Sequence, residues 1–127
     1  MNRHKSAHNT DSDSLLTDLE SFIDQSKIIA FCIDSLICKS VSYIRFNNTN
    51  FLKLTLKTKP QDIKIRYLNE VSGKWKEFAN NNFSRAYRSN NDYMTILNEA
   101  KLRAQSNNEV LLVKFENNAI RDWYNFQ

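Results

Sequence analysis

The chain has 127 residues, of which 41% are hydrophobic and 25% are charged, the proportions of an ordinary folded domain. The chain contains one glycine and one proline, and a single glycine excludes a glycine-rich loop of the kind that binds phosphate. Its apolar runs are all shorter than a membrane span, which needs about 20 residues. The formal net charge of +4 is unevenly spread, because residues 51–89 contain nine basic and three acidic residues. One folded domain is therefore expected, with its positive charge in the middle of the chain and no membrane contact.

The first residues of the chain are polar and show no periodicity. They lack the apolar stretch of a secretory signal. His4 and His8 have a helix-compatible spacing for metal ligands, but no third ligand accompanies them, so we expect no metal site. We therefore predict a disordered N-terminal tail over 1–12 and a single domain over 13–127.

A long helix is expected directly after this tail. Apolar residues recur at spacings of three and four, which predicts a helix over about 14–38. The residues of this seam are Leu15, Leu19, Phe22, Ile29, Ile33 and Leu36, with Ser26 at the position between Phe22 and Ile29. The alternative that stays open is a break near Ser26, with the apolar part of 28–38 forming a buried strand instead of helix.

The two cysteines, Cys32 and Cys38, both lie in this apolar stretch. Cysteine in such surroundings behaves as a small hydrophobic residue, so we predict two buried free thiols. Free thiols are typical of reducing compartments, which indicates an intracellular protein of the nucleus or cytoplasm.

Alternating and helical patterns then continue to the end of the chain. Strands are expected at about 40–46, 51–57, 62–69, 75–78 and 109–115, and helices at about 92–106 and 119–127. Short connections between strands favour antiparallel pairing. The expected fold is a two-layer α+β domain, in which the long N-terminal helix and a second helix pack on one face of an antiparallel meander sheet of four to five strands.

The predicted order over residues 14–90, one helix, a three-stranded meander and a further helix with a basic sheet, resembles the small RNA-binding subunits of the signal recognition particle's Alu domain. No diagnostic motif accompanies this resemblance, and no residue roles are carried over from it. What it implies is limited to a fold of this kind and contact with RNA.

Basic residues alternate with apolar ones in the segment LKLTLKTKPQDIKIRYL at 52–68. If these strands pair, one sheet face is cationic and could hold the phosphates of RNA or DNA, with an aromatic ring to stack on a base. An ordinary solvated sheet face is the competing interpretation. The predicted nucleic-acid contacts are Tyr43, Arg45, Lys53, Lys57, Lys64, Arg66, Lys74, Lys76, Arg85 and Arg88.

Apolar residues occur on more than one side of the predicted long helix, so more than one side must be covered. The seam itself is expected to pack on the sheet of the same chain, with docking to another chain as the alternative. Residues on its other side and in the C-terminal segment are the candidates for binding a protein partner. They are Leu16, Ile23, Ile37, Trp123 and Tyr124.

Catalytic arrangements are missing from the sequence. Neither histidine lies inside the predicted domain, and Asp34 is the single acid in strongly apolar surroundings. We therefore expect no enzyme, no catalytic residue and no cofactor. The leading hypothesis is a non-catalytic small subunit of a multi-protein or nucleoprotein complex. The alternative is a free-standing nucleic-acid-binding domain, and a small enzyme is the third.

Overall fold

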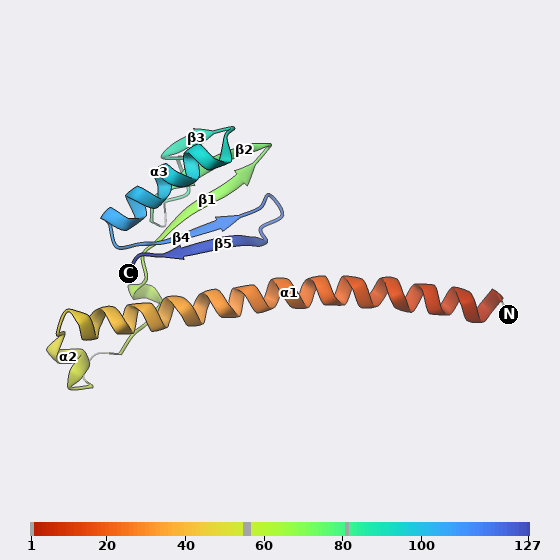
Figure 1. Ribbon diagram of the computed structural model, residues 1–127, viewed down its shortest axis with the longest axis horizontal. Coiled ribbons are helices and arrows are strands. Elements are labelled where there is room, and N and C mark those ends of the chain that lie inside the picture. Colours follow the sequence, from red (N-terminus) through yellow and green to blue (C-terminus); the bar gives the residue numbers. More distant parts are fainter. Residues whose placement is uncertain (1, 55–56, 81) are drawn as a thin grey trace.

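The computed structural model describes the backbone of residues 2–54, 57–80 and 82–127, and their side chains from Ser14 onward. One long helix runs past a small sheet, which carries a second helix on its other side (Figure 1). In chain order the elements are α1 (Asn2–Arg45), α2 (Thr49–Leu52), the 3₁₀ turn η1 (Pro60–Asp62), β1 (Ile65–Val71), β2 (Lys74–Phe78), β3 (Arg88–Asn90), α3 (Tyr93–Ser106), β4 (Val110–Lys114) and β5 (Ile120–Asn125).

The five strands form one mixed sheet in the order β3-β2-β1-β4-β5. All neighbouring strands run antiparallel except β1 and β4, which pair in parallel. A two-residue turn at Ser72 and Gly73, both at positive φ (52° and 75°), joins β1 to β2, as hairpins favour. Strand β4 is instead reached through α3, and such a crossover allows parallel pairing. The α+β class is confirmed, while the purely antiparallel sheet is wrong.

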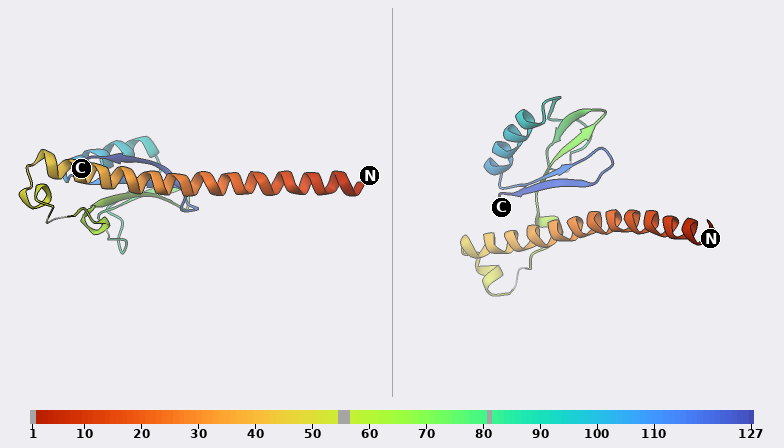
Figure 2. Two further views of the ribbon diagram at one scale, coloured as in Figure 1. Left: turned by 90° about the horizontal axis from the view of Figure 1, so that it is seen from below. Right: turned by 45° about the vertical axis from the view of Figure 1, so that its right-hand side comes forward.

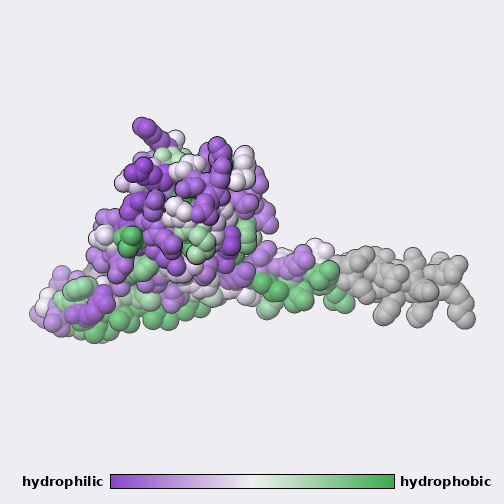
Figure 3. Space-filling view, turned by 45° about the horizontal axis from the view of Figure 1, so that its top comes forward, coloured by the Kyte–Doolittle hydropathy of each residue, from purple (hydrophilic) through white to green (hydrophobic). Residues whose placement is uncertain are grey.

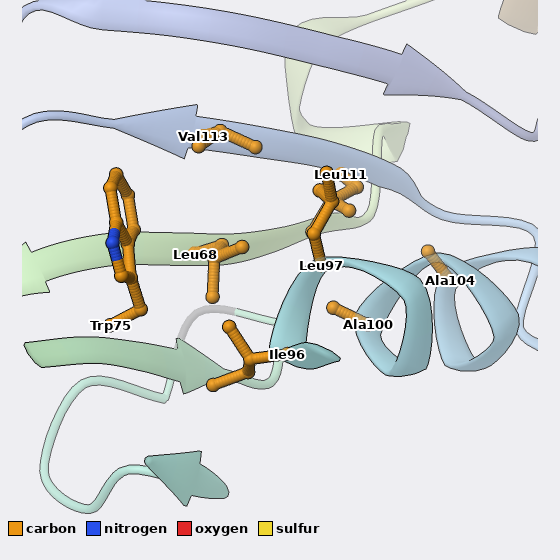
Figure 4. Packing of buried hydrophobic residues seen from close by; sticks show 8 residues of the cluster. All are labelled: Leu68, Trp75, Ile96, Leu97, Ala100, Ala104, Leu111 and Val113. Carbon is orange, nitrogen blue, oxygen red and sulfur yellow. The ribbon is translucent and has the colours of Figure 1, made fainter. Parts of the chain in front are cut away.

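Helices α3 and α1 lie on opposite faces of the sheet (Figures 1 and 2). Leu111 and Val113 of β4 join the cluster under α3 (Figure 4), whereas Val110 and Leu112 join the cluster that contains Phe31 of α1. Successive strand residues point to opposite faces, so β4 is buried on both sides. The prediction that both helices share one face is therefore wrong, because β4 has no polar face to expose to water.

Two predicted strands do not form. Residues 40–46 prolong α1 to Arg45, because the apolar residues there continue at helical spacing until Asn47, which has a φ of 52°. Residues 51–54 belong to α2 and the turn that follows it, and residues 55–56 lie outside the described part of the chain. The resemblance to the Alu-domain subunits depended on this meander and is lost with it.

Other elements follow the sequence more closely. The segment 28–38 is helix and not strand, and β2, α3 and β4 form within a residue or two of the expected ranges. Strand β1 begins later than predicted, at Ile65. The C-terminal segment was expected to be a helix but forms β5, because its alternating residues pair with β4. Strand β3 was not predicted.

The structure continues α1 through residues 2–12, of which it describes the backbone only. The flexible tail over 1–12 and the division from the domain at 13–127 therefore stay predictions.

The core beneath α3 provides a direct test of the packing. Replacing Leu111 with alanine should lower the free energy of unfolding by about 2–5 kcal/mol, because the side chain is fully buried and leaves a cavity. The same change at Leu102, which is exposed on α3, should stay within about 0.5 kcal/mol. Urea unfolding of the two variants measures both values, and equal effects would contradict the described core.

Candidate functional site

The predicted cationic sheet face does not form. Tyr43 and Arg45 lie near the end of α1, Lys53 caps α2, and Lys57 lies in the connection to η1. Lys64 is exposed just before β1 begins. These five predicted nucleic-acid contacts therefore belong to a helix and its following loops, because the strands that would have aligned them are absent.

Arg66 is on the sheet, but its charge is neutralised. It is buried and donates hydrogen bonds to Glu77 on β2 (Nη1 to Oε2, 2.6 Å) and to Glu109 before β4 (Nε to Oε2, 2.7 Å). Buried charges need such partners, because desolvation of an unpaired ion is costly. The expectation that Arg66 is available to phosphates is wrong for this reason.

Arg103 of α3 completes this buried group. Its Nε donates to Oε2 of Glu77 over 2.8 Å, and its Nη2 pairs with Oε1 of the same carboxylate. The hydrogen bonds that Arg103 donates to the Glu77 carboxylate raise the pKa of Arg103, which keeps the guanidinium charged. Two arginines and two glutamates thus form a neutral network that joins β1, β2, α3 and the start of β4.

The remaining predicted basic contacts are divided between the two faces of the sheet. Lys74 and Lys76 alternate with Trp75 along β2. The side chain of Trp75 belongs to the cluster under α3. Both lysines therefore point to the face opposite α3. Arg88 of β3 is instead paired in register with Glu77, on the α3 side. Arg85 is exposed in the loop between β2 and β3.

The most extensive apolar surface of the described chain lies along α1. Eleven apolar side chains there have exposed fractions between 45% for Ile23 and 67% for Leu15, and one of them, Ile28, lies on the sheet side beside Phe31 and Ile65. We call the other ten residues the outer stripe: Leu15, Leu16, Leu19, Phe22, Ile23, Ile29, Ile33, Ile37, Val41 and Ile44. Figure 3 shows apolar residues gathered along the edge of α1 that faces away from the sheet. Exposed patches of this size are rare on monomers and mark interaction sites.

The opposite side of α1 is held against the sheet. Phe31 is buried beside the apolar residues of β4, and its ring meets that of Trp123 edge-on at 5.9 Å between centroids. Asp34 accepts hydrogen bonds through Oδ2 from Trp123 Nε1 (3.0 Å) and from Asn125 Nδ2 (3.2 Å). Gln127 Nε2 donates to the backbone oxygen of Ser35 over 2.9 Å. These contacts determine which side of α1 faces water.

The predicted seam and its docking candidates are placed differently from expectation. The seam was expected to pack on the sheet, yet Leu15, Phe22 and Ile33 are exposed, because Phe31 and its neighbours occupy that position instead. Leu16, Ile23 and Ile37 are also exposed, and they belong to the same outer stripe. Val41 and Ile44 were missed, since 40–46 was read as a strand; the helical spacing of their apolar residues was the available signal.

Trp123 and Tyr124, also predicted to bind a partner, lie on β5 and pack within this chain. Trp123 joins the cluster under α1, and Tyr124 joins the cluster under α3. The Nζ of Lys101 lies 3.9 Å from the centroid of the Tyr124 ring. Burial and a hydrogen bond with Asp122 raise the pKa of Tyr124 to about 12. Both aromatic residues therefore serve the fold of this chain.

The cysteines are free, as expected, but differ in burial. Cys32 is exposed on α1, so its predicted burial is wrong. The next residue along the helix from buried Phe31 points in a different direction, and Cys32 therefore faces solvent. Cys38 is half-buried, and desolvation together with Asp34 raises the pKa of its thiol. A raised pKa lowers the thiolate fraction and makes the thiol less reactive.

Neither a known protein family, a curated protein nor a solved structure matches this chain significantly. Among the described residues, no group of three or more metal-ligating side chains converges. Over the same part of the chain, no helix is long and apolar enough to cross a membrane.

The buried ion network distinguishes Arg66 from its exposed neighbour. Arg66→Glu should lower the free energy of unfolding by about 3–5 kcal/mol or prevent folding, because it places a third carboxylate beside Glu77 and Glu109. Lys64→Glu makes the same charge change at an exposed position and should stay within about 0.5 kcal/mol. Thermal and urea unfolding measure the difference. A stable Arg66→Glu variant would show that the network is not formed.

The attachment of α1 to β5 is tested at Asp34. Asp34→Ala should lower the free energy of unfolding by about 1–3 kcal/mol, because the Trp123 and Asn125 donors lose their charged acceptor. Asp24→Ala, an exposed position on the same helix, serves as the control and should change stability by at most about 0.5 kcal/mol. Urea unfolding followed by circular dichroism compares them. Equal stabilities would contradict the attachment.

Proposed function

We propose that this chain is a non-catalytic subunit that docks an apolar helix of a protein partner on the outer stripe of α1. The observation that carries the proposal is the exposure of ten apolar side chains over residues 15–44. The sheet is already covered on both faces by α1 and α3, and within the described part of the chain these ten side chains stay exposed, although α2 packs beside the C-terminal end of α1.

A helix is the partner element that fits the stripe best. Residues 15–44 form 30 residues of continuous helix, which corresponds to about 45 Å. Apolar residues at spacings of three and four along one side of a helix accept the matching side of a second helix. The stripe is broad and convex, so it presents a ridge for side-by-side packing and not a pocket for a small molecule.

The proposal does not include RNA or DNA. The ten predicted nucleic-acid contacts are divided among α1, the loops and both faces of the sheet, and Arg66 is neutralised within the core. A free-standing nucleic-acid-binding domain, the alternative from the sequence, would need these cations on one surface. The two free thiols fit a reducing intracellular compartment, nuclear or cytoplasmic.

Acidic substitutions on the stripe test the proposal. The tagged chain, expressed in its source cells, should elute from a sizing column well above its own 15.0 kDa. Ile29→Asp combined with Ile33→Asp should shift it to the mass of one chain, because charges placed in an apolar contact are desolvated without a partner. Ser21→Asp combined with Gln25→Asp adds the same two charges at exposed positions outside the stripe and should leave the complex intact.

Circular dichroism should show the same helix content for all of these variants, so that loss of the complex is not loss of fold. Nuclease treatment of the lysate should leave the elution unchanged. The proposal fails if the Ile29→Asp, Ile33→Asp variant elutes at the same position as the wild type. If nuclease treatment alone shifts the wild type to the mass of one chain, nucleic acid is the partner.

A further inference from the structure

The apolar positions of the outer stripe follow the period of the helix itself. Eight residues of the outer stripe, together with Ser26, follow one line along α1: Leu15, Leu19, Phe22, Ser26, Ile29, Ile33, Ile37, Val41 and Ile44. Their mean spacing is about 3.6 residues, the turn of an α-helix, so the stripe runs straight along the helix instead of winding around it. Two such stripes can remain in contact over their full length with little supercoiling.

The line of nine positions is symmetric to within one residue about its middle, which lies between Ile29 and Ala30. If a second copy of α1 lies antiparallel with its centre at the same point, residue numbers opposite each other add up to 59. Leu15 then faces Ile44, and Phe22 faces Ile37. Ser26, the small residue on this line, faces the larger Ile33. Six of the nine positions therefore face another of the nine. The other three, Leu19, Ile29 and Val41, fall opposite Ser40, Ala30 and Asp18, each one residue away from a position on the line.

The charges of α1 and the following loop favour the antiparallel direction. Residues 11–24 contain five acidic residues and no lysine or arginine, whereas residues 35–48, which face them in the antiparallel register, contain Lys39 and Arg45 and no acid. A parallel pair would place the two acidic segments side by side and the two basic segments side by side. An antiparallel pair places each acidic segment alongside a basic one, which lowers the repulsion and creates complementarity.

The available area is sufficient for a stable contact. Ten apolar side chains, each exposed by 45% or more, present on the order of 1,000 Å² per copy. A standard interface uses about 800 Å² per partner, and the largest apolar patch of a typical monomer is about 300–600 Å². The sheet of each copy lies on the other side of its α1, whereas α2 lies beside the C-terminal end of α1 on the side away from the sheet (Figures 1 and 2). The approach is therefore open over the middle of the stripe, and α2 flanks the end of the stripe near Ile44.

We propose that the outer stripe of α1 binds the same stripe of a second copy of this chain, as an antiparallel helix pair with two-fold symmetry. This inference rests on the proposed function and names the partner. A two-fold contact uses the same surface on both copies and closes on itself, so the assembly stops at two chains.

Sedimentation analysis of the purified full-length chain tests the stoichiometry. The wild type and the Ser21→Asp, Gln25→Asp control should sediment at twice 15.0 kDa, and the Ile29→Asp, Ile33→Asp variant at 15.0 kDa. A wild type that stays at 15.0 kDa at its highest soluble concentration overturns the self-pairing. If the purified wild type is monomeric but the complex in source cells is lost in the Ile29→Asp, Ile33→Asp variant, docking through the stripe stands and the partner is a different protein. If these substitutions change neither the sedimentation of the purified chain nor the complex in source cells, both proposals fail.

Cross-linking tests the direction of the pair. In chains whose Cys32 and Cys38 are replaced by serine, one variant carries Ser26→Cys and a second carries Ile33→Cys. The antiparallel pair places residue 26 opposite residue 33, whereas the two copies of residue 26 are about 10 Å apart along the axis, too far for a disulfide. Mild oxidation of the mixed variants should therefore yield the mixed disulfide. A disulfide between two Ser26→Cys chains would show a parallel pair, and no disulfide at all would overturn the proposed register.

Discussion

The contact between α1 and the last strand determines how the rest of this molecule is presented to solvent. Phe31 and Asp34 turn one side of the helix toward β4 and β5 through an aromatic pair and two hydrogen bonds to a carboxylate. A helix is a rigid cylinder, so the choice of one side for the sheet leaves the opposite side for water or for another molecule. The exposure of the outer stripe is therefore a direct result of contacts made on the far side of α1.

A second lesson concerns charge. Counting cations along 51–89 indicates a basic protein surface, yet the structure buries Arg66 of this segment with Glu77 and Glu109. The half-buried Arg103 of α3 pairs with the same Glu77. Their mutual pairing makes the core locally neutral while the sequence remains locally basic. Net charge describes a whole segment, whereas the availability of each charge depends on partners that are distant in sequence, here on β2, α3 and the start of β4.

Much of the sheet could be predicted, and most of the site could not. The continuous apolar run of β4 and the capped helix after Asp92 are local patterns, and both formed near the expected residues. The alternation in LKLTLK is equally clear, but its described residues 52–54 belong to the end of α2 and the turn after it and pair with no described strand. Likewise, helical periodicity identified apolar positions on more than one side of α1. It did not decide which side packs on the sheet, because Phe31 and Ile33 are equally apolar and only the tertiary contact with Trp123 separates them.

The order of these elements along the chain has a consequence for biosynthesis. Asp34 lies 89 residues before Trp123, its partner on β5, so α1 leaves the ribosome long before the strand that anchors it exists. At about 5–20 residues per second, the helix waits roughly 5–20 s with both of its apolar sides uncovered. During that interval the nascent helix is open to chaperones and to helices of neighbouring chains on the same messenger RNA. The proposed pairing of two outer stripes is thus able to begin before the fold of either chain is complete.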